Sequence, residues 1–99
     1  MSYTFHPEAA MEYADQVTHY KTLRLQLGEQ FHAAVKAAAS KACAAPGRYL
    51  VELPPAIRRI PVKGFPYSLI FREIIGNVQV LAVAHYRRRP LFWLGRISA

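Results

Sequence analysis

The spacing of apolar residues changes once along the chain, at the dipeptide Pro54-Pro55. Before it, apolar side chains recur every three or four positions, which is the period of an α-helix with one buried face. After it, they alternate or run continuously over short stretches bounded by turn residues, which is typical of β-strands. Helices followed by a block of strands predict an α+β fold rather than alternating β-α units.

Two helices are predicted before this dipeptide. Residues 2–6 alternate and suit a short first strand, after which Pro7 and Glu8 mark a helix start. This helix should end between residues 25 and 28, and a second should run from about residue 28 to 45. The short connection predicts an antiparallel helical hairpin. The apolar positions expected to face the core are Ala10, Tyr13, Ala14, Val17, Tyr20, Phe31, Ala34, Val35, Ala38 and Ala42, with Glu12, Asp15, Gln16 and Lys21 on the outer face.

Three further strands are predicted after the dipeptide, at residues 56–62, 65–75 and 78–86. Lys63-Gly64 should form the first turn, and Gly76-Asn77 is a two-residue hairpin signal. The expected order is therefore β-α-α-β-β-β, with the helical hairpin packed on one face of a small antiparallel sheet. A short helical turn is expected near the C-terminus, at residues 91–96.

Length and apolar content predict a single domain over residues 1–99 that can bury a core. No apolar run approaches the roughly 20 residues that span a bilayer. The N-terminal stretch lacks the basic and apolar segments of a signal peptide. Cys43, the one cysteine, lies in an alanine-rich stretch and is expected to be a small core residue. These features predict a reducing, cytoplasmic location.

The net charge of +7 belongs entirely to the second half of the chain. Residues 1–56 hold five basic and five acidic side chains, whereas residues 57–99 hold eight basic side chains against Glu73 alone. Seven of those eight are arginines, which fork onto phosphate or carboxylate groups. The asymmetry predicts a polyanionic partner, either nucleic acid or an acidic protein segment. A solvated basic face that only aids solubility is the other interpretation.

Strand alternation places several of these charges on one face of the expected sheet. In the strand at residues 65–75, Tyr67, Leu69 and Phe71 should lie on one face, and Ser68, Ile70 and Arg72 on the other. The charged positions that can share a face across neighbouring strands are Arg58 or Arg59, Arg72, and His85 or Arg87.

Three stretches together resemble the toxins of type II toxin–antitoxin systems in the RelE/ParE superfamily. "FHPEAAMEYADQVTHY" is similar to their opening strand and first helix, and "LGEQFHAAVKAAASKACAAPGRY" to the second helix of the ParE-like branch. "IRRIPVKGFPYSLIFREIIGNVQVLAVAHYRRRPLFWLGR" carries the most specific part, an arginine-rich strand, a hairpin and a final A-V-x-H-x-R-R-x-P-x-x-W. The resemblance covers nearly the whole chain.

The resemblance implies a compact α+β toxin that needs no cofactor and is neutralised by a cognate antitoxin. The antitoxin usually applies an acidic or amphipathic C-terminal segment to the toxin, and the two together bind their own promoter DNA. Growth inhibition and plasmid stabilisation are the implied roles. ParE-like members are associated with poisoning DNA gyrase, whereas RelE-like members cleave mRNA in the ribosome. We expect this chain to be closer to ParE.

The ribonuclease alternative needs groups that move protons and cations that stabilise a charged phosphorane. RelE-like ribonucleases often carry a tyrosine shortly after the last arginines, where this chain has Phe92 and Trp93. Strand alternation is expected to turn Tyr86 away from the basic face. Whether the chain is an enzyme therefore stays open. The catalytic candidates are Lys63, Arg72, His85 and Arg88.

A gyrase-directed toxin needs a contact surface, for which arginine and tryptophan are typical anchors. Two alternatives stay open: Trp93 caps the sheet core, and His85 is a structural hydrogen-bonding residue. No metal site is expected, because the histidines lack ligand spacing. A plain nucleic-acid-binding module is a third class, although neither helix is basic enough to read a groove. The expected target or nucleic-acid contacts are Arg58, Arg59, Arg72, Arg87, Arg88, Arg89 and Trp93.

Overall fold

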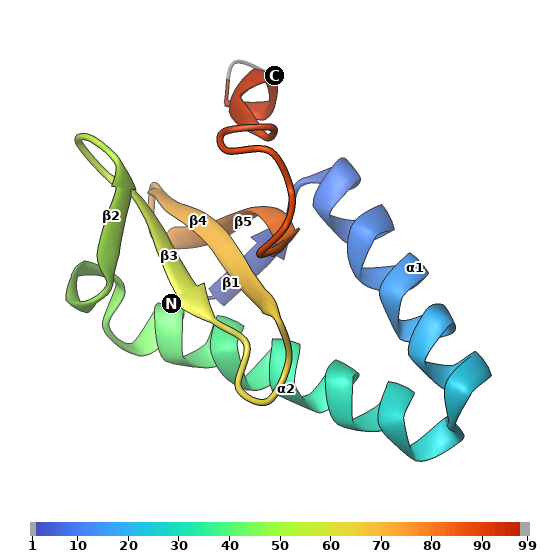
Figure 1. Cartoon of the computed structure of the whole chain (residues 1–99). Coiled ribbons are helices and arrows are strands. Elements are labelled where there is room, and N and C mark those ends of the chain that lie inside the picture. Colours follow the sequence, from blue (N-terminus) through green and yellow to red (C-terminus); the bar gives the residue numbers. More distant parts are fainter. Residues whose placement is uncertain (1, 98–99) are drawn as a thin grey trace.

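A twisted five-stranded sheet carries two long helices on one face (Figure 1). The computed structural model describes residues 2–97. The elements are β1 (Ser2–Phe5), α1 (Pro7–Leu23), α2 (Leu25–Ala44), β2 (Leu50–Leu53), β3 (Ile57–Pro61), β4 (Tyr67–Ile74) and β5 (Asn77–His85), with short 3₁₀ helices at Pro46–Arg48 and Leu94–Arg96. The predicted α+β fold is confirmed, and β2 is an addition to it.

The strands lie in the order β1-β5-β4-β3-β2, with β1 parallel to β5 and every other neighbouring pair antiparallel. β2 is an edge strand of four residues, too short for its alternation to stand out between a 3₁₀ turn and Pro54. The sequence pattern therefore misses β2 and predicts three strands after the helices, whereas the structure has four within residues 2–97. The longest strands, β4 and β5, lie inside the sheet.

The two helices meet at a one-residue bend and then diverge (Figure 1). Arg24 ends α1 in an extended conformation and directly precedes α2, which starts three residues earlier than predicted. At the contact, a Cβ added to Gly28 would lie 2.2 Å from Lys21 Cγ and 3.0 Å from the Val17 carbonyl oxygen. Glycine at this position therefore allows the close approach that forms the hairpin.

The main core fills the space between the helices and the sheet. Phe31 and Val35 of α2 are fully buried there, and Tyr67, Leu69 and Phe71 of β4 face them as predicted. Three alanines of α2, residues 38, 39 and 42, complete the same cluster. Cys43 is half-buried at its margin, where burial raises the pKa of its thiol. The thiol therefore stays protonated, as expected for a packing residue.

The buried face of α1 differs from the prediction. Ala10 and Ala14 are exposed, whereas Ala9 is fully buried. Glu12 and Gln16, expected in solvent, point toward the sheet: Gln16 Oε1 accepts a hydrogen bond from the Tyr67 hydroxyl at 2.7 Å. The helix is rotated because polar groups at the end of the sheet need partners when the helix covers them.

A second core covers the opposite face of the sheet. Residues 87–97, which we name the C-terminal strap, fold back across that face. Trp93 of the strap is only 2% exposed and packs on Ile57, Ile70 and Leu81. The strap thus caps the sheet, and its last turn at Leu94–Arg96 confirms the predicted helical turn.

A bulge in β5 decides which side chains face the strap. The register between β4 and β5 shifts after Ile70, so that Leu81 and Ala82, although consecutive, both join the strap-side core. For the rest of β5, each side chain therefore lies on the face opposite to the one that simple alternation predicts. His85 packs edge-to-face on Tyr67 on the helix side, with ring centroids 5.0 Å apart. Tyr86 lies on the strap side, contrary to the prediction.

The hairpin between β4 and β5 is displaced by one residue from its predicted turn. Ile74 pairs with Asn77, so the two-residue loop is Ile75-Gly76. Both loop residues have positive φ, 25° for Ile75 and 71° for Gly76. The loop thus places a fully exposed, β-branched side chain where Asn or Gly is usual.

Candidate functional site

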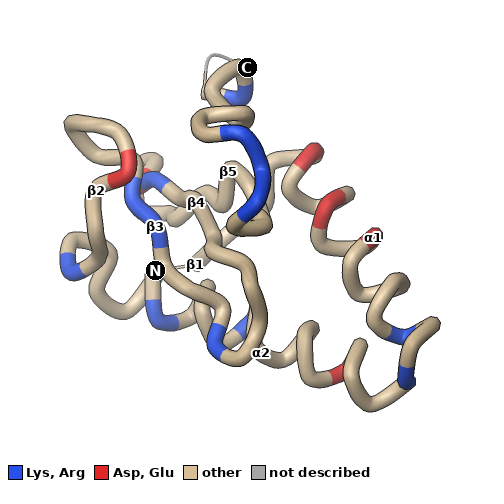
Figure 2. Tube along the Cα trace, viewed as in Figure 1, with Lys and Arg blue, Asp and Glu red and all other residues tan. Residues whose placement is uncertain are grey.

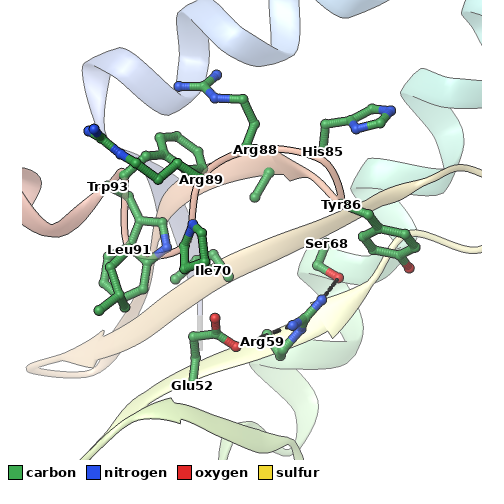
Figure 3. A pocket seen from close by; sticks show the side chains of 13 residues that line it. Glu52, Arg59, Ser68, Ile70, His85, Tyr86, Arg88, Arg89, Leu91 and Trp93 are labelled. Carbon is green, nitrogen blue, oxygen red and sulfur yellow. Dashed lines mark hydrogen bonds and ion pairs between the residues drawn. The ribbon is translucent and has the colours of Figure 1, made fainter.

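A shallow hollow lined by three arginines opens on the strap side of the sheet (Figure 3). Ser68 and Ile70 of β4 line it, Glu52 and Arg59 approach from β2 and β3, and the strap closes it opposite. Its volume is about 140 Å³. We name it the basic hollow. Its lining residues are Glu52, Arg59, Ser68, Ile70, Ala84, His85, Tyr86, Arg88, Arg89, Pro90, Leu91, Phe92 and Trp93.

Arg59 is the cation inside the hollow. Its Nη1 donates to Glu52 Oε1 at 3.3 Å, and its Nη2 donates to the Ser68 hydroxyl at 3.1 Å. The Tyr86 ring centroid lies 6.0 Å from the guanidinium carbon. The Arg59 side chain remains 36% exposed, so it can still accept an anionic partner. Figure 3 shows this guanidinium directed at Ser68 and Glu52.

Arg88 is held at the rim by an aromatic ring and a carboxylate. Its guanidinium carbon lies 3.9 Å from the Phe92 ring centroid, a close cation–π contact. Its Nη1 lies 3.9 Å from Glu12 Oε2 on α1. The side chain is nevertheless 52% exposed. The strap thus presents a half-exposed guanidinium whose direction is restricted from two sides.

The strap is anchored by Arg96, which sequence reasoning did not single out. Its Nη1 and Nη2 donate to the two Glu12 oxygens at 2.9 and 2.8 Å, and Nη1 also donates to the Leu81 carbonyl at 2.9 Å. Its side chain is 10% exposed. The hydrogen bonds that Arg96 donates to Glu12 raise the pKa of Arg96, against the lowering effect of burial. The signal was available: a charge three residues after Trp93, inside an otherwise apolar stretch.

Arg72 also fastens the strap. Its Nε donates to Gln79 Oε1 at 3.0 Å, and its Nη1 donates to the Ile97 carbonyl at 3.1 Å. It lies on the strap side of β4, as predicted, but outside the lining of the basic hollow. The role of Arg72 as a contact or catalyst stays a prediction.

The remaining predicted site residues are dispersed. Arg58 points to the helix side, where its Nη1 donates to the Tyr49 carbonyl at 2.8 Å. Lys63 is exposed after β3 and lines a separate groove beside α2. Arg87 and Arg89 are exposed, and within residues 2–97 no ion pair holds either side chain. Of the four catalytic candidates, only His85 and Arg88 line the basic hollow.

The His85 side chain makes a local hydrogen bond at the end of β5. Its Nδ1 accepts a hydrogen bond from the Arg87 backbone N–H at 3.0 Å. In the neutral ring that role leaves the proton on Nε2. His85 therefore restrains the start of the strap while its other nitrogen stays available.

A second recess adjoins the first and shares two residues with it. We name it the helix-side hollow; it lies between α1 and the end of the sheet and has a volume of about 350 Å³. His85 and Arg88 line both recesses. Figure 2 shows acidic positions on α1 across from the basic segment of the strap. The lining residues are Glu12, Asp15, Gln16, Tyr67, Val83, His85 and Arg88.

The part of the chain that the structure describes contains no helix long and apolar enough to cross a membrane. Nor do residues 2–97 bring three or more His, Cys, Asp or Glu side chains together in a way that could hold a metal ion.

Comparison with known proteins identifies a fold. No protein-family model matches the chain, and no curated protein matches its sequence. A solved structure described as "Chromosomal ParDE TA system from P. aeruginosa" contains a similar chain, with a TM-score of 0.65 and 21% identity. The match covers 86% of this chain and 95% of that chain. The chain therefore has the α+β fold that its resemblance to the RelE/ParE superfamily implies.

Proposed function

We propose that this chain is the toxin of a type II toxin–antitoxin system, that a cognate antitoxin neutralises it, and that it acts in the cytoplasm on DNA gyrase. The observation that carries the proposal is the arginine-rich strap on a fold shared with a chain of a ParDE system. Arg87, Arg88 and Arg89 are exposed side by side at the start of that strap. Exposed arginines of this kind suit desolvated pairs with carboxylates of a protein partner.

Two features favour binding over hydrolysis. Lys63 and Arg72 lie outside the recess that contains His85 and Arg88, so the four catalytic candidates do not converge on one reacting atom. The basic hollow, at about 140 Å³, is also smaller than the roughly 300–1,000 Å³ typical of small-molecule sites. A gyrase-directed toxin needs neither convergence nor a deep pocket.

One observation favours the alternative, a ribosome-dependent mRNA endoribonuclease. Tyr86 lines the basic hollow with its ring 6.0 Å from the Arg59 guanidinium carbon. A phenol beside a cation can carry a proton in phosphodiester cleavage. Tyr86 rather than His85 is then the residue to test, because the His85 ring packs on Tyr67.

The deciding experiment is induced expression of this chain alone in bacteria, with a DNA-damage reporter and mRNA integrity read from one culture. Growth arrest with induced damage and intact mRNA is the expected result. Fragmented mRNA that disappears in Tyr86→Phe would establish the ribonuclease instead. Tyr86→Phe keeps the ring beside Arg59, so a gyrase-directed activity should tolerate it.

The antitoxin is tested in the same system. Co-expression of the protein encoded next to this chain should restore growth and co-purify with it. Because the pairing proposed here depends on charge, the complex should weaken when Arg87, Arg88 and Arg89 are replaced by glutamine. Unchanged growth on expression of the chain alone would refute the proposal that it is a toxin.

A further inference from the structure

The charges around Arg88 change sign over a short distance. On one side lies the basic hollow, which combines Arg59, Arg88 and Arg89 with the single acid Glu52. On the other lies the helix-side hollow, in which Glu12 and Asp15 join Arg88. Arg88 and His85 line both recesses. A partner that crosses Arg88 therefore meets cations first and carboxylates next.

The carboxylates differ in how far they are compensated. Both oxygens of Glu12 accept hydrogen bonds from buried Arg96, so its charge is largely balanced. Glu8 also approaches Arg96, at 3.4 Å, although its side chain is 61% exposed. Asp15 is exposed, and among residues 2–97 no ion pair balances it. Asp15 is thus the uncompensated anion beside the strap.

This arrangement discriminates between two classes of macromolecule. A nucleic acid carries a negative charge at every phosphate, so a strand laid across Arg88 into the helix-side hollow would bring phosphates against Asp15. A protein segment can place an acidic side chain over the strap and a basic one over α1. Complementary charge on both sides raises association rates and excludes wrong partners.

We infer that the surface formed by the two hollows binds a protein segment of mixed charge on the target, with an acidic side chain at Arg88 and Arg89 and a basic side chain at Asp15. This inference rests on the proposed function, and names the part of the target that the toxin contacts: protein rather than DNA or RNA. Arg88 is suited to the first contact because Phe92 and Glu12 restrict its guanidinium before binding.

The test replaces Asp15 by asparagine, which removes the charge and keeps the shape. Glu29→Gln is the matched control: Glu29 is an exposed acid on α2, lines a different recess, and gives the same change in net charge. Growth arrest should need about fivefold more Asp15→Asn protein, as expected for one exposed charge pair, and should be unchanged for Glu29→Gln. Circular dichroism verifies that both variants fold.

If the partner is a nucleic acid, Asp15→Asn should change the dose needed for growth arrest in the opposite direction. Removal of the Asp15 charge would then strengthen binding, and Asp15→Asn would arrest growth at a lower dose than Glu29→Gln. That result, or equal activity of the two variants, overturns the inference. An Asp15→Asn variant that arrests growth normally but escapes the antitoxin also overturns it, because Asp15 would then contact the antitoxin and not the target.

A binding measurement keeps the inference testable if the chain alone does not arrest growth, a result that would remove the proposed function. The purified protein and both variants are titrated with a 12-nucleotide oligothymidine at low salt. Equal, small gains in affinity for Asp15→Asn and Glu29→Gln support the inference, since the nucleic acid then senses only net charge. A gain confined to Asp15→Asn places the strand over α1 and overturns it.

Discussion

Arg96 and Glu12 lie 84 positions apart in the chain and form a two-point ion pair, with Nη1–Oε1 and Nη2–Oε2 distances of 2.9 and 2.8 Å. The same carboxylate accepts a hydrogen bond from the Val83 backbone N–H at 3.0 Å. One acidic side chain of α1 therefore joins the sheet to the last turn of the strap.

Loss of either partner of this pair should strongly destabilise the protein. Arg96→Met leaves the mostly buried Glu12 carboxylate without its hydrogen-bonded cation, with only Arg88 at 3.9 Å, which should reduce the free energy of unfolding by about 3 kcal/mol. Glu12→Gln in the same protein should recover part of that loss, because the unpaired charge disappears. Urea denaturation of the two single variants and the double variant measures the coupling; additive effects would contradict the pairing.

Trp93 should contribute mainly to the stability of the fold rather than to contact with a target. Its side chain is 2% exposed in the strap-side core, so Trp93→Ala should cost about 3–5 kcal/mol. Trp93→Phe should cost less and retain growth arrest under conditions where it is folded. A Trp93→Phe variant of near-normal stability that has lost activity would show that the indole contacts the target directly. Thermal denaturation and the growth assay, run together, separate the two roles.

Gly28→Ala should open the helical hairpin. The added Cβ would overlap Lys21 Cγ, which can move, but would also lie 3.0 Å from the backbone oxygen of Val17. We expect a loss of about 1–3 kcal/mol, although alanine favours helices. Gly47→Ala is the control, since no atom lies within 4 Å of a Cβ at that position. Comparable losses at the two glycines in thermal denaturation would argue against close helix contact.

Ile75→Asn should stabilise the protein. Ile75 occupies the left-handed region at φ 25° with its side chain fully exposed, so the substitution removes strain and little packing. A gain of about 1 kcal/mol is expected, because asparagine tolerates this conformation. Ile75→Val keeps the β-branch and should give no gain. Chemical denaturation of the three proteins decides the matter, and a destabilised Ile75→Asn would reveal an unrecognised contact.

Alkaline pH should weaken the fold through Tyr67. Burial, with a smaller effect of the neighbouring Tyr20, raises the pKa of Tyr67 from 10.0 to about 12. A raised pKa means that the folded state favours the neutral phenol. This contribution to stability is complete below pH 10 and is lost as the pH rises toward 12. Unfolding free energies of the wild type and Tyr67→Phe between pH 9 and 12 should converge; parallel curves would exclude the effect.

The sequence predicted those parts of the fold that depend on local periodicity. The start of α1 at Pro7, the buried stripe of α2 and the alternation of β4 follow from side-chain spacing alone. The rotation of α1 does not, because Glu12 turns inward only when Arg96 is there to meet it. Partners this distant in the chain leave no periodic signal.

The prediction of which side chains line the candidate site failed because of one irregularity, the bulge in β5. The bulge near Leu81 reverses the facing of everything after it in β5. The sequence placed His85 on the basic face and Tyr86 away from it, whereas the structure puts Tyr86 beside Arg59. The arginine composition of the strap was evident from sequence, but which arginines fasten it and which remain exposed depended on tertiary contacts.

The parallel pairing of β1 with β5 also has a consequence for the order of events during synthesis. Ser2 pairs with Asn77 and Phe5 with Val80, so β1 waits for β5, which is synthesised much later. α1 waits in the same way for Arg96. Contacts so distant in sequence form slowly and late. The nascent chain therefore leaves β1 unpaired until β5 has emerged from the ribosome, and its basic surface is assembled only once the strap has followed.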